Sequence, residues 1–296
     1  MKALFNSGSK ARCGLPAIYF CMDRGQGMNK IGCGLAGSAV AAILALVMSA
    51  IAVPHPVLGD ANPSKASVMP FAPGERLVFE LRWAVIPAGK AVLEVMPMKT
   101  IDGSKAYHFR MTAKSNAFVD LFFKVRDRID SYVAEDMSHS IHYRHKQREG
   151  EAAKNIKVHF DWDTSTARYF EGNKTRNPID IAPGTFDPLS VFYYSRLADF
   201  ETNGIIQCPV SDGKKCITGM AKIIRKETVE VPGGTFEAFL MEPVLKEIGG
   251  VFKKSKNAKI QLWVTADERR LPVKIASKVS VGSFVGELMA IENGPS

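Results

Sequence analysis

The chain has 296 residues, of which 46% are hydrophobic and 23% charged, and its formal net charge is +9. This length allows one or two domains with a substantial core. Nearly half of the positive excess falls in residues 1–59, so the rest is only mildly basic. That charge density is too low for a nucleic-acid-binding protein, and no nucleic-acid partner is expected.

An uncharged run, Ile31 to Val53, follows Lys30 and ends in small residues. Its strongly apolar part, Ala39 to Met48, has the length of a signal-peptide core and falls short of the roughly 20 residues of a spanning helix. We therefore expect a signal peptide at 28–59, preceded by a mis-annotated leader at 1–27. The predicted location is periplasmic; the alternative is an uncleaved signal that anchors the protein to the inner membrane.

After the signal, prolines punctuate a predicted linker at 60–73, and one exported β domain is expected over 74–291. Two cysteines, Cys208 and Cys216, remain in this domain and flank an Asp-Gly turn. In an oxidising compartment an even count favours a disulfide. A Cys208–Cys216 disulfide that closes a hairpin is therefore predicted, in preference to a zinc site or a redox pair.

The dominant pattern from Glu75 onward has a period of two. Apolar residues alternate with polar ones in the segments 77–85, 156–162 and 260–264, and turn signals such as Asp102-Gly103 and Asp212-Gly213 recur at short spacing. About twelve to fourteen strands are expected. Because no strand–helix–strand alternation occurs, the strands should pair antiparallel.

One segment follows a helical period instead. Asp187 and Pro188 form a typical helix start, and five apolar residues then share one helical face: Leu189, Phe192, Tyr193, Leu197 and Phe200. The predicted fold is mainly β: a long, curved antiparallel sheet, as a half-barrel or an open barrel-like roll, with one mid-chain helix. A β-sandwich is the alternative.

Three segments together resemble a known family. They are the opening Pro73–Phe79 with Trp83 and Gly89, the helix entry Phe186–Arg196, and the late hairpin Leu262–Val273. They are similar to a bacterial family of exported proteins catalogued as domain of unknown function 3108, over about residues 71–291. The resemblance implies an envelope location and a β-rich domain, and it carries over no catalytic residue.

Motifs for catalysis are weak. Ser211 to Lys214 matches Ser-x-x-Lys formally, but it lies in a hairpin loop and not at the start of a helix. His139, His142 and His145 recur every third residue, and on a strand His142 faces away from the other two. A metal site would require His145 to meet His159 or a carboxylate across strands. We therefore predict no catalytic residue, no metal site and no cofactor.

Charged residues offer a surface for binding. Arg144, Lys146 and Arg148 share the outward face with His142, and Lys253, Lys254, Lys256 and Lys259 crowd a later loop. These cations could dock on anionic headgroups or acidic glycans, or be ordinary surface charge. The segment 126–130 indicates a cross-strand charge ladder. Asp161 and Asp163 share a face without the partners of a glycosidase.

Two functions remain open. The first is a non-enzymatic envelope protein that binds a lipid, another apolar ligand or an envelope partner on a curved sheet, with a peripheral contact to an anionic membrane surface. The apolar residues Phe79, Leu81, Trp83, Phe160 and Trp162 would form either its core or its pocket. The alternative is an exported hydrolase acting on cell-wall or lipid material, with His145 or His159 beside Asp161.

Overall fold

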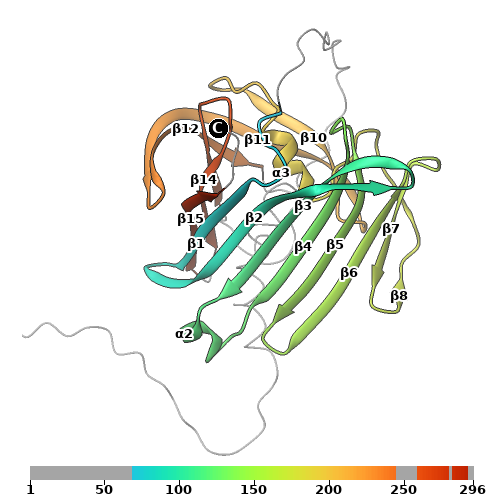
Figure 1. Ribbon diagram of the computed structural model, residues 1–296, viewed down its shortest axis with the longest axis horizontal. Coiled ribbons are helices and arrows are strands. Elements are labelled where there is room, and N and C mark those ends of the chain that lie inside the picture. The colour runs from blue at the N-terminus through green and yellow to red at the C-terminus, as the bar shows by residue number, and fades with distance from the viewer. Residues whose placement is uncertain (1–68, 245–258, 280–281, 293–296) are drawn as a thin grey trace, which may run out of the picture. The chain divides into compact units, whose positions relative to one another are not determined.

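The computed structural model describes residues 69–244, 259–279 and 282–292, and these form mainly β structure (Figure 1). The predicted leader, the signal peptide and residues 60–68 of the linker lie outside the described residues, as do Lys253, Lys254 and Lys256. Within the described ranges, no helix has the length and apolar character needed to cross a membrane.

The first half of the domain is a meander of neighbouring strands with one short helix. Its elements are β1 (Arg76–Trp83), β2 (Ile86–Ile101), β3 (Ser104–Ser115), α2 (Ala117–Asp120), β4 (Arg126–Ala134), β5 (Ser140–Glu149), β6 (Ala152–Asp161), β7 (Thr166–Glu171), β8 (Lys174–Thr175) and β9 (Ile179–Asp180).

A second helix leads into the other half. Its elements are α3 (Ser190–Ser195), β10 (Ile205–Ser211), β11 (Cys216–Val231), β12 (Gly234–Pro243), β13 (Lys259–Thr265), β14 (Pro272–Val279) and β15 (Gly282–Glu292).

All strands belong to one 15-stranded sheet in the order β10-β11-β12-β13-β14-β15-β1-β2-β3-β4-β5-β6-β7-β8, with β9 paired to β7. Every strand pair within the described residues is antiparallel. Strands that pair are also neighbours in sequence, except where β15 joins β1 and where β9 pairs with β7. The predicted antiparallel sheet is confirmed. The sheet exceeds the expected strand number partly because β8 and β9, of two residues each, give no periodic signal.

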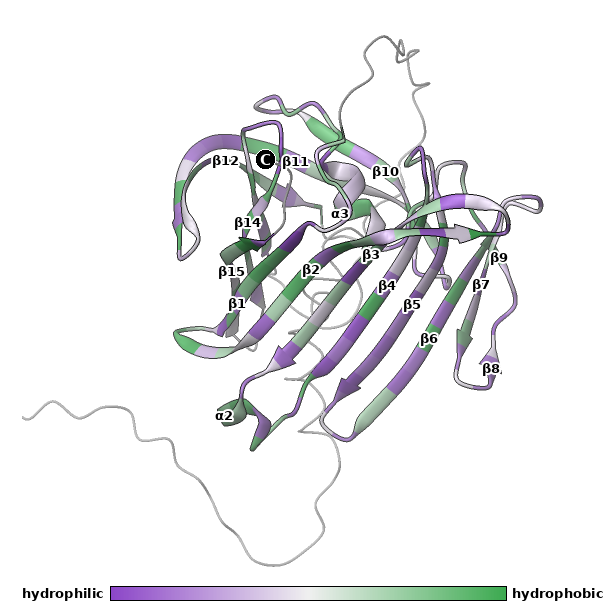
Figure 2. Ribbon diagram, in the orientation of Figure 1, coloured by the Kyte–Doolittle hydropathy of each residue, from purple (hydrophilic) through white to green (hydrophobic). Residues whose placement is uncertain are grey.

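The period of two has the expected cause. In β1, Leu77, Phe79 and Leu81 are buried, whereas the residues between them are partly exposed. Figure 2 shows the same alternation as green and purple bands along the strands. One face of the sheet is therefore the core, and Phe79, Leu81 and Phe160 belong to it.

The helix α3 packs against this core. Tyr193 stacks on Phe109 of β3 with ring centroids 3.9 Å apart, and Phe71 meets both rings edge-on. Phe71 is only 1% exposed, so part of the segment expected to be a linker packs into the domain. The helix is shorter than the sequence pattern indicated, although Phe200 beyond its end is buried as expected.

The two ends of the strand order approach one another. Val210 of β10 forms a parallel bridge with Phe186. A Cβ built at Gly213, in the β10–β11 turn, would lie 2.8 Å from Val158 of β6 and 3.3 Å from Tyr169 of β7. A single sheet whose distant strands meet in this way is strongly curved, which confirms the predicted open roll and not the sandwich.

Candidate functional site

One end of the sheet gathers several turns. Because the strands are antiparallel, the β1–β2, β3–β4, β5–β6 and β7–β8 connections all leave the same end, which carries α2 (Figure 1). Backbone hydrogen bonds tie these connections together: Asn116 donates to Ala88, and Gly150 donates to Lys124. We call this end, formed by residues 83–86, 116–126, 146–155 and 171–174, the α2 rim.

The α2 rim exposes large apolar side chains. Leu121 is 77% exposed, Phe122 70% and Phe118 58%, and no residue of α2 is buried. The adjacent β1–β2 turn exposes Val85 to 79% and Trp83 to 45%. Six of the eight large hydrophobic residues found exposed in the described part of the chain lie here, Ile86 being the sixth. Such concentration is typical of an interaction surface, since single exposed apolar residues are usually scattered.

This apolar segment has a fixed position. The Asn116 side chain accepts a hydrogen bond from Val119 N at 2.9 Å and donates to Pro87 O at 2.6 Å, which caps α2 and joins it to β2. Arg126 Nη1 donates to Asp120 Oδ1 at 3.0 Å. Hydrogen bonds from Arg126 and Ser115 hold the pKa of Asp120 below its usual value. The exposed side chains are therefore presented by an anchored turn.

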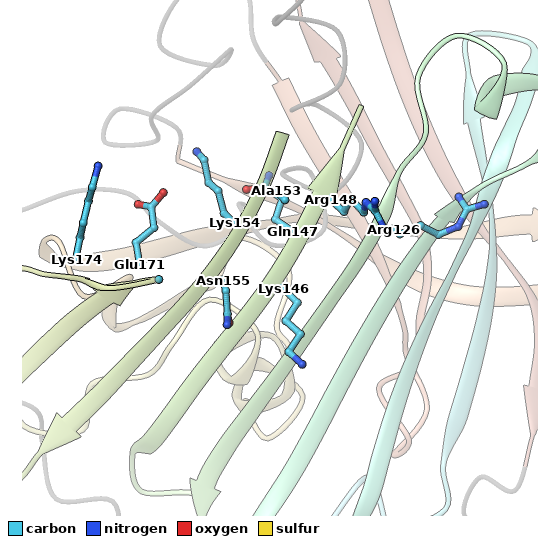
Figure 3. Close-up of a pocket in the computed structure, with 10 residues that line it drawn as sticks. Arg126, Lys146, Gln147, Arg148, Ala153, Lys154, Asn155, Glu171 and Lys174 are labelled. Atoms are coloured by element: carbon cyan, nitrogen blue, oxygen red, sulfur yellow. The ribbon is translucent and has the colours of Figure 1, made fainter. Parts of the chain in front are cut away.

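Beside α2 lies a basic groove of ≈ 730 Å³, drawn in Figure 3. Lys154, Glu171 and Lys174 project to one side of the strands, whereas Lys146 and Asn155 project to the other (Figure 3). The lining holds five cationic side chains against the single carboxylate of Glu171; the cations are Arg126, Lys146, Arg148, Lys154 and Lys174. The groove is therefore suited to anionic groups.

Cations also face one another across the strands. Lys90 is directly opposite Lys114, and Lys114 is directly opposite Arg126. Next along the sheet, Arg128 is directly opposite Lys146. Like charges directly opposite one another destabilise a sheet, so these rows lower the stability of the fold. Packing of the sheet therefore gives no reason for them. The outward orientation predicted for Arg144, Lys146 and Arg148 is confirmed, since all three are exposed.

The charge ladder predicted at 126–130 is also present, with Asp130 as its centre. Asp130 Oδ1 accepts hydrogen bonds from His108 Nε2 and Arg110 Nε, both at 2.8 Å, and Arg128 Nε donates to Oδ2 at 2.7 Å. Burial opposes ionisation of Asp130, but these hydrogen bonds outweigh it and hold its pKa well below the usual range. This ladder is a structural feature of the outer face.

The four histidines separate as strand geometry requires. His142 and His159 are directly opposite on the outer face, with Nδ1 atoms 3.1 Å apart. His145 points to the inner face, where its Nε2 lies 3.7 Å from Oδ2 of the buried Asp127. His139 lies against Trp162. Within the described residues, no group of three His, Cys, Asp or Glu side chains could hold a metal ion.

The predicted Cys208–Cys216 disulfide is wrong, because both cysteines are free thiols in the structure. In the hairpin register, Cys208 is opposite Gly219 and Cys216 is opposite Ser211. The two cysteines are thus three positions apart along the ladder, roughly 10 Å at the usual strand rise, beyond the span of a disulfide. The odd offset also directs their side chains to opposite faces. Sequence spacing could not supply this register.

Other candidate residues have structural roles. Ser211 accepts a hydrogen bond from Gly213 N, whereas Lys214 Nζ lies over the Tyr169 ring, so Ser-x-x-Lys forms no catalytic pair. Asp161 accepts hydrogen bonds from the backbone N–H groups of Asp163 and Thr164 and shapes a turn.

The aromatic residues expected to form either a core or a pocket lie mostly in the core. Phe79 and Phe160 are each 2% exposed, and a cavity beside Phe79 is only ≈ 10 Å³. Trp162 donates to Ser140 O, whereas Trp83 is exposed on the α2 rim.

The sequence analysis did not identify the exposed apolar cluster at α2, because Phe118, Leu121 and Phe122 are too few to show a period. Their position beside Lys124 and Arg126 was the available signal.

The fold and the rim define a class: a mainly β protein built on one open antiparallel sheet, with an apolar and basic surface at one end of its strands. The chain belongs to the DUF3108 family, described as a protein of unknown function, whose model matches residues 78–289. This confirms the resemblance noted in the sequence. No curated protein matches the chain.

The chain is also similar to solved structures of low sequence identity. A beta-barrel-like protein of DUF1849 from Brucella abortus is 9% identical with a TM-score of 0.46, covering 74% of this chain and 97% of that one. A "putative lipoprotein" from Parabacteroides distasonis is 9% identical with a TM-score of 0.35, covering 77% and 100%. A "putative exported protein with YmcC-like fold" from Bacteroides fragilis is 10% identical with a TM-score of 0.33, covering 75% and 97%.

Proposed function

We propose that this protein is an exported, non-enzymatic envelope protein that docks on an anionic membrane surface through the α2 rim. The observation that carries the proposal is the exposure of Leu121 and Phe122 beside a groove with five cations and one carboxylate. Apolar side chains that enter the headgroup region, flanked by cations that attract anionic lipids, are the two components of peripheral membrane binding.

The combination favours a lipid surface over an acidic glycan, because a glycan would leave the apolar side chains in water. Each cation near an anionic membrane contributes about 1 kcal/mol, and burying a large apolar side chain contributes roughly 1.5–3 kcal/mol. Together these terms are sufficient for reversible attachment. Among the described residues, the cavity between Phe79 and Phe192 of α3 is only ≈ 10 Å³, which is too small for a lipid chain.

The alternative hydrolase has less support. His145 and His159 face opposite sides of the sheet, so the two imidazoles cannot act on one substrate. Asp161 is engaged in a turn. The cluster of Asp187 with Ser140 and Ser190 is fully buried and caps α3.

Cosedimentation with vesicles tests the proposal. The purified protein should bind vesicles containing phosphatidylglycerol, fail to bind pure phosphatidylcholine vesicles, and dissociate as salt is raised. Leu121→Ser with Phe122→Ser should weaken binding by about tenfold or more. The matched control is Ile291→Ser, which is 36% exposed beside β1 at the opposite end and should bind like the wild type.

Charge reversal provides the second arm. Lys146→Glu with Lys154→Glu should abolish the preference for anionic vesicles, whereas Lys105→Glu with Lys222→Glu, an equal charge change on exposed residues outside the rim, should not. Lipids carrying a quencher should reduce the fluorescence of Trp83, and the Trp83→Phe variant should lose that response. Equal binding to both lipids would refute the proposal. Dimerisation of the chain that buries the apolar side chains of the α2 rim would also refute the proposal.

A further inference from the structure

We propose that His142 and His159 form a binding site for a divalent transition-metal ion on the outer face of the sheet. The two residues are directly opposite one another on β5 and β6, and their rings are 4.8 Å apart. The site is separate from the α2 rim and does not depend on membrane binding. Imidazole nitrogens are preferred ligands of Zn²⁺, Cu²⁺ and Ni²⁺.

The geometry matches two ligands of one ion. The Nδ1 atoms are 3.1 Å apart, and with metal–nitrogen bonds of about 2.0–2.1 Å this separation gives a ligand–metal–ligand angle of about 98°. That angle lies between the right angle of square-planar sites and the tetrahedral angle. The ion would replace the proton shared by the two Nδ1 atoms, and each ring would then carry its proton on Nε2.

The backbone keeps the pair in place. The next pair along the ladder, Tyr143 and Val158, points inward and is buried. The two histidines form the last pair of the β5–β6 ladder, but β5 is also paired with β4 and β6 with β7, so rotation of the backbone is restricted. A metal ion would find two ligands already oriented, so little ordering cost would oppose binding.

Nearby charges act in both directions. Burial lowers the pKa of His142, and His159 and Arg144 lower it further, while Asp102 opposes them. A lowered pKa favours the neutral imidazole, which is the form that binds a metal ion. Arg168 is directly opposite His159, and the carboxylate of Asp161 is close enough to His159 for their charges to interact. Arg144 and Arg168 weaken cation binding, whereas Asp102 and Asp161 strengthen it.

Two protein ligands leave the other coordination positions to water. Affinity should therefore be modest, and Cu²⁺ should bind more tightly than Zn²⁺ by the usual order of divalent ions. Mg²⁺, which prefers oxygen ligands, should not bind. These expectations distinguish an imidazole site from a general electrostatic attraction for cations.

Isothermal titration with Zn²⁺, Cu²⁺ and Mg²⁺ tests the site, using protein without a histidine tag. His142→Gln and His159→Gln should each weaken Zn²⁺ and Cu²⁺ binding by about tenfold or more. The matched control, His139→Gln, should bind like the wild type, because His139 contacts Ser138 and Trp162 and not the pair. Binding should weaken as pH falls below the ordinary histidine pKa.

Two further measurements keep the result unambiguous. Thermal unfolding without metal checks that each variant folds, and nitrogen couplings in the Cu²⁺ electron paramagnetic resonance spectrum report the number of bound imidazoles. The proposal predicts two nitrogens in the wild type and one in each single variant. Unchanged binding in both variants, equal loss in His139→Gln, or a Mg²⁺ affinity equal to that of Zn²⁺ would overturn it.

Discussion

Glu75 and Arg196 form a buried ion pair that joins the start of β1 to the residue directly after α3. Arg196 Nη1 lies 2.6 Å from Glu75 Oε1, and Nη2 lies 2.9 Å from Oε2, with both side chains at most 1% exposed. Arg196 also donates to the backbone carbonyls of Pro70 and Arg269. One guanidinium therefore connects the segment directly before β1, the helix and the β13–β14 turn.

Arg196→Met should destabilise the domain by about 3–5 kcal/mol, because Glu75 would remain buried without its partner. Urea unfolding followed by circular dichroism measures the change. Arg82→Met is the control: its partner Glu80 is 3.4 Å away and both are partly exposed, so a change below about 1 kcal/mol is expected. If the two variants were equally stable, the central role of Arg196 would be wrong.

Asp187→Ala should also be strongly destabilising. Asp187 Oδ1 accepts hydrogen bonds from Leu189 N and Ser190 N, and Oδ2 accepts from the hydroxyls of Ser131 and Ser140. Loss of the helix cap and of the partners for two buried hydroxyls should cost about 2–4 kcal/mol in unfolding free energy. Asp161→Ala, which removes an exposed turn carboxylate, should have a smaller effect in the same assay. The reverse order would contradict this assignment.

Asp130 makes the fold sensitive to acid. Burial raises the pKa of Asp130, but hydrogen bonds from His108, Arg128 and Arg110 lower it by more than burial raises it. The folded pKa therefore lies below the unfolded one. The stabilisation is therefore present above the unfolded value of about 3.9 and is lost as pH falls through the folded pKa.

Asp130→Asn should remove this part of the pH dependence. At pH 7 the variant should be less stable by about 1–3 kcal/mol, and the difference from the wild type should shrink as pH falls below about 4. Unfolding free energies measured between pH 3 and pH 7 test this, with Asp163→Asn as an exposed control. A constant difference across that range would show that Asp130 does not titrate as described.

The thiols should be reduced under all conditions that keep the protein folded. Burial raises the pKa of Cys208 to about 12, so its alkylation should be slow in the native state, whereas the partly exposed Cys216 should react faster. Mass spectrometry of alkylated peptides, with no reducing step, should find both residues modified after denaturation. A reductant should leave the unfolding midpoint unchanged. Recovery of a Cys208–Cys216 peptide pair would refute the observed register.

Much of the fold was predictable because strand formation is a local matter. The alternation of Leu77, Phe79 and Leu81 with polar neighbours indicates a strand with one buried face, whatever its partner. Asp187 and Pro188 indicated a helix start, and α3 begins two residues after Pro188. Asp187 accepts hydrogen bonds from the N–H groups of Leu189 and Ser190. Short loops then left antiparallel pairing as the natural arrangement.

The candidate site was less predictable. The outward orientation of Lys146 and Arg148 follows from strand periodicity alone. The like-charge row of Lys90, Lys114 and Arg126 depends on the pairing register of three strands, and register is not visible in one sequence. For the same reason the spacing of Cys208 and Cys216 favoured a disulfide that the hairpin register rules out.

The sequence by itself determined which residues alternate and approximately where the mid-chain helix begins, since both depend on neighbours along the chain. Tertiary structure alone decided that β15 pairs with β1, that Arg196 meets Glu75, and that His142 and not His145 meets His159. Such contacts join residues far apart in sequence. They arise when the curved sheet closes around its core, because burial of that core sets the register of every strand.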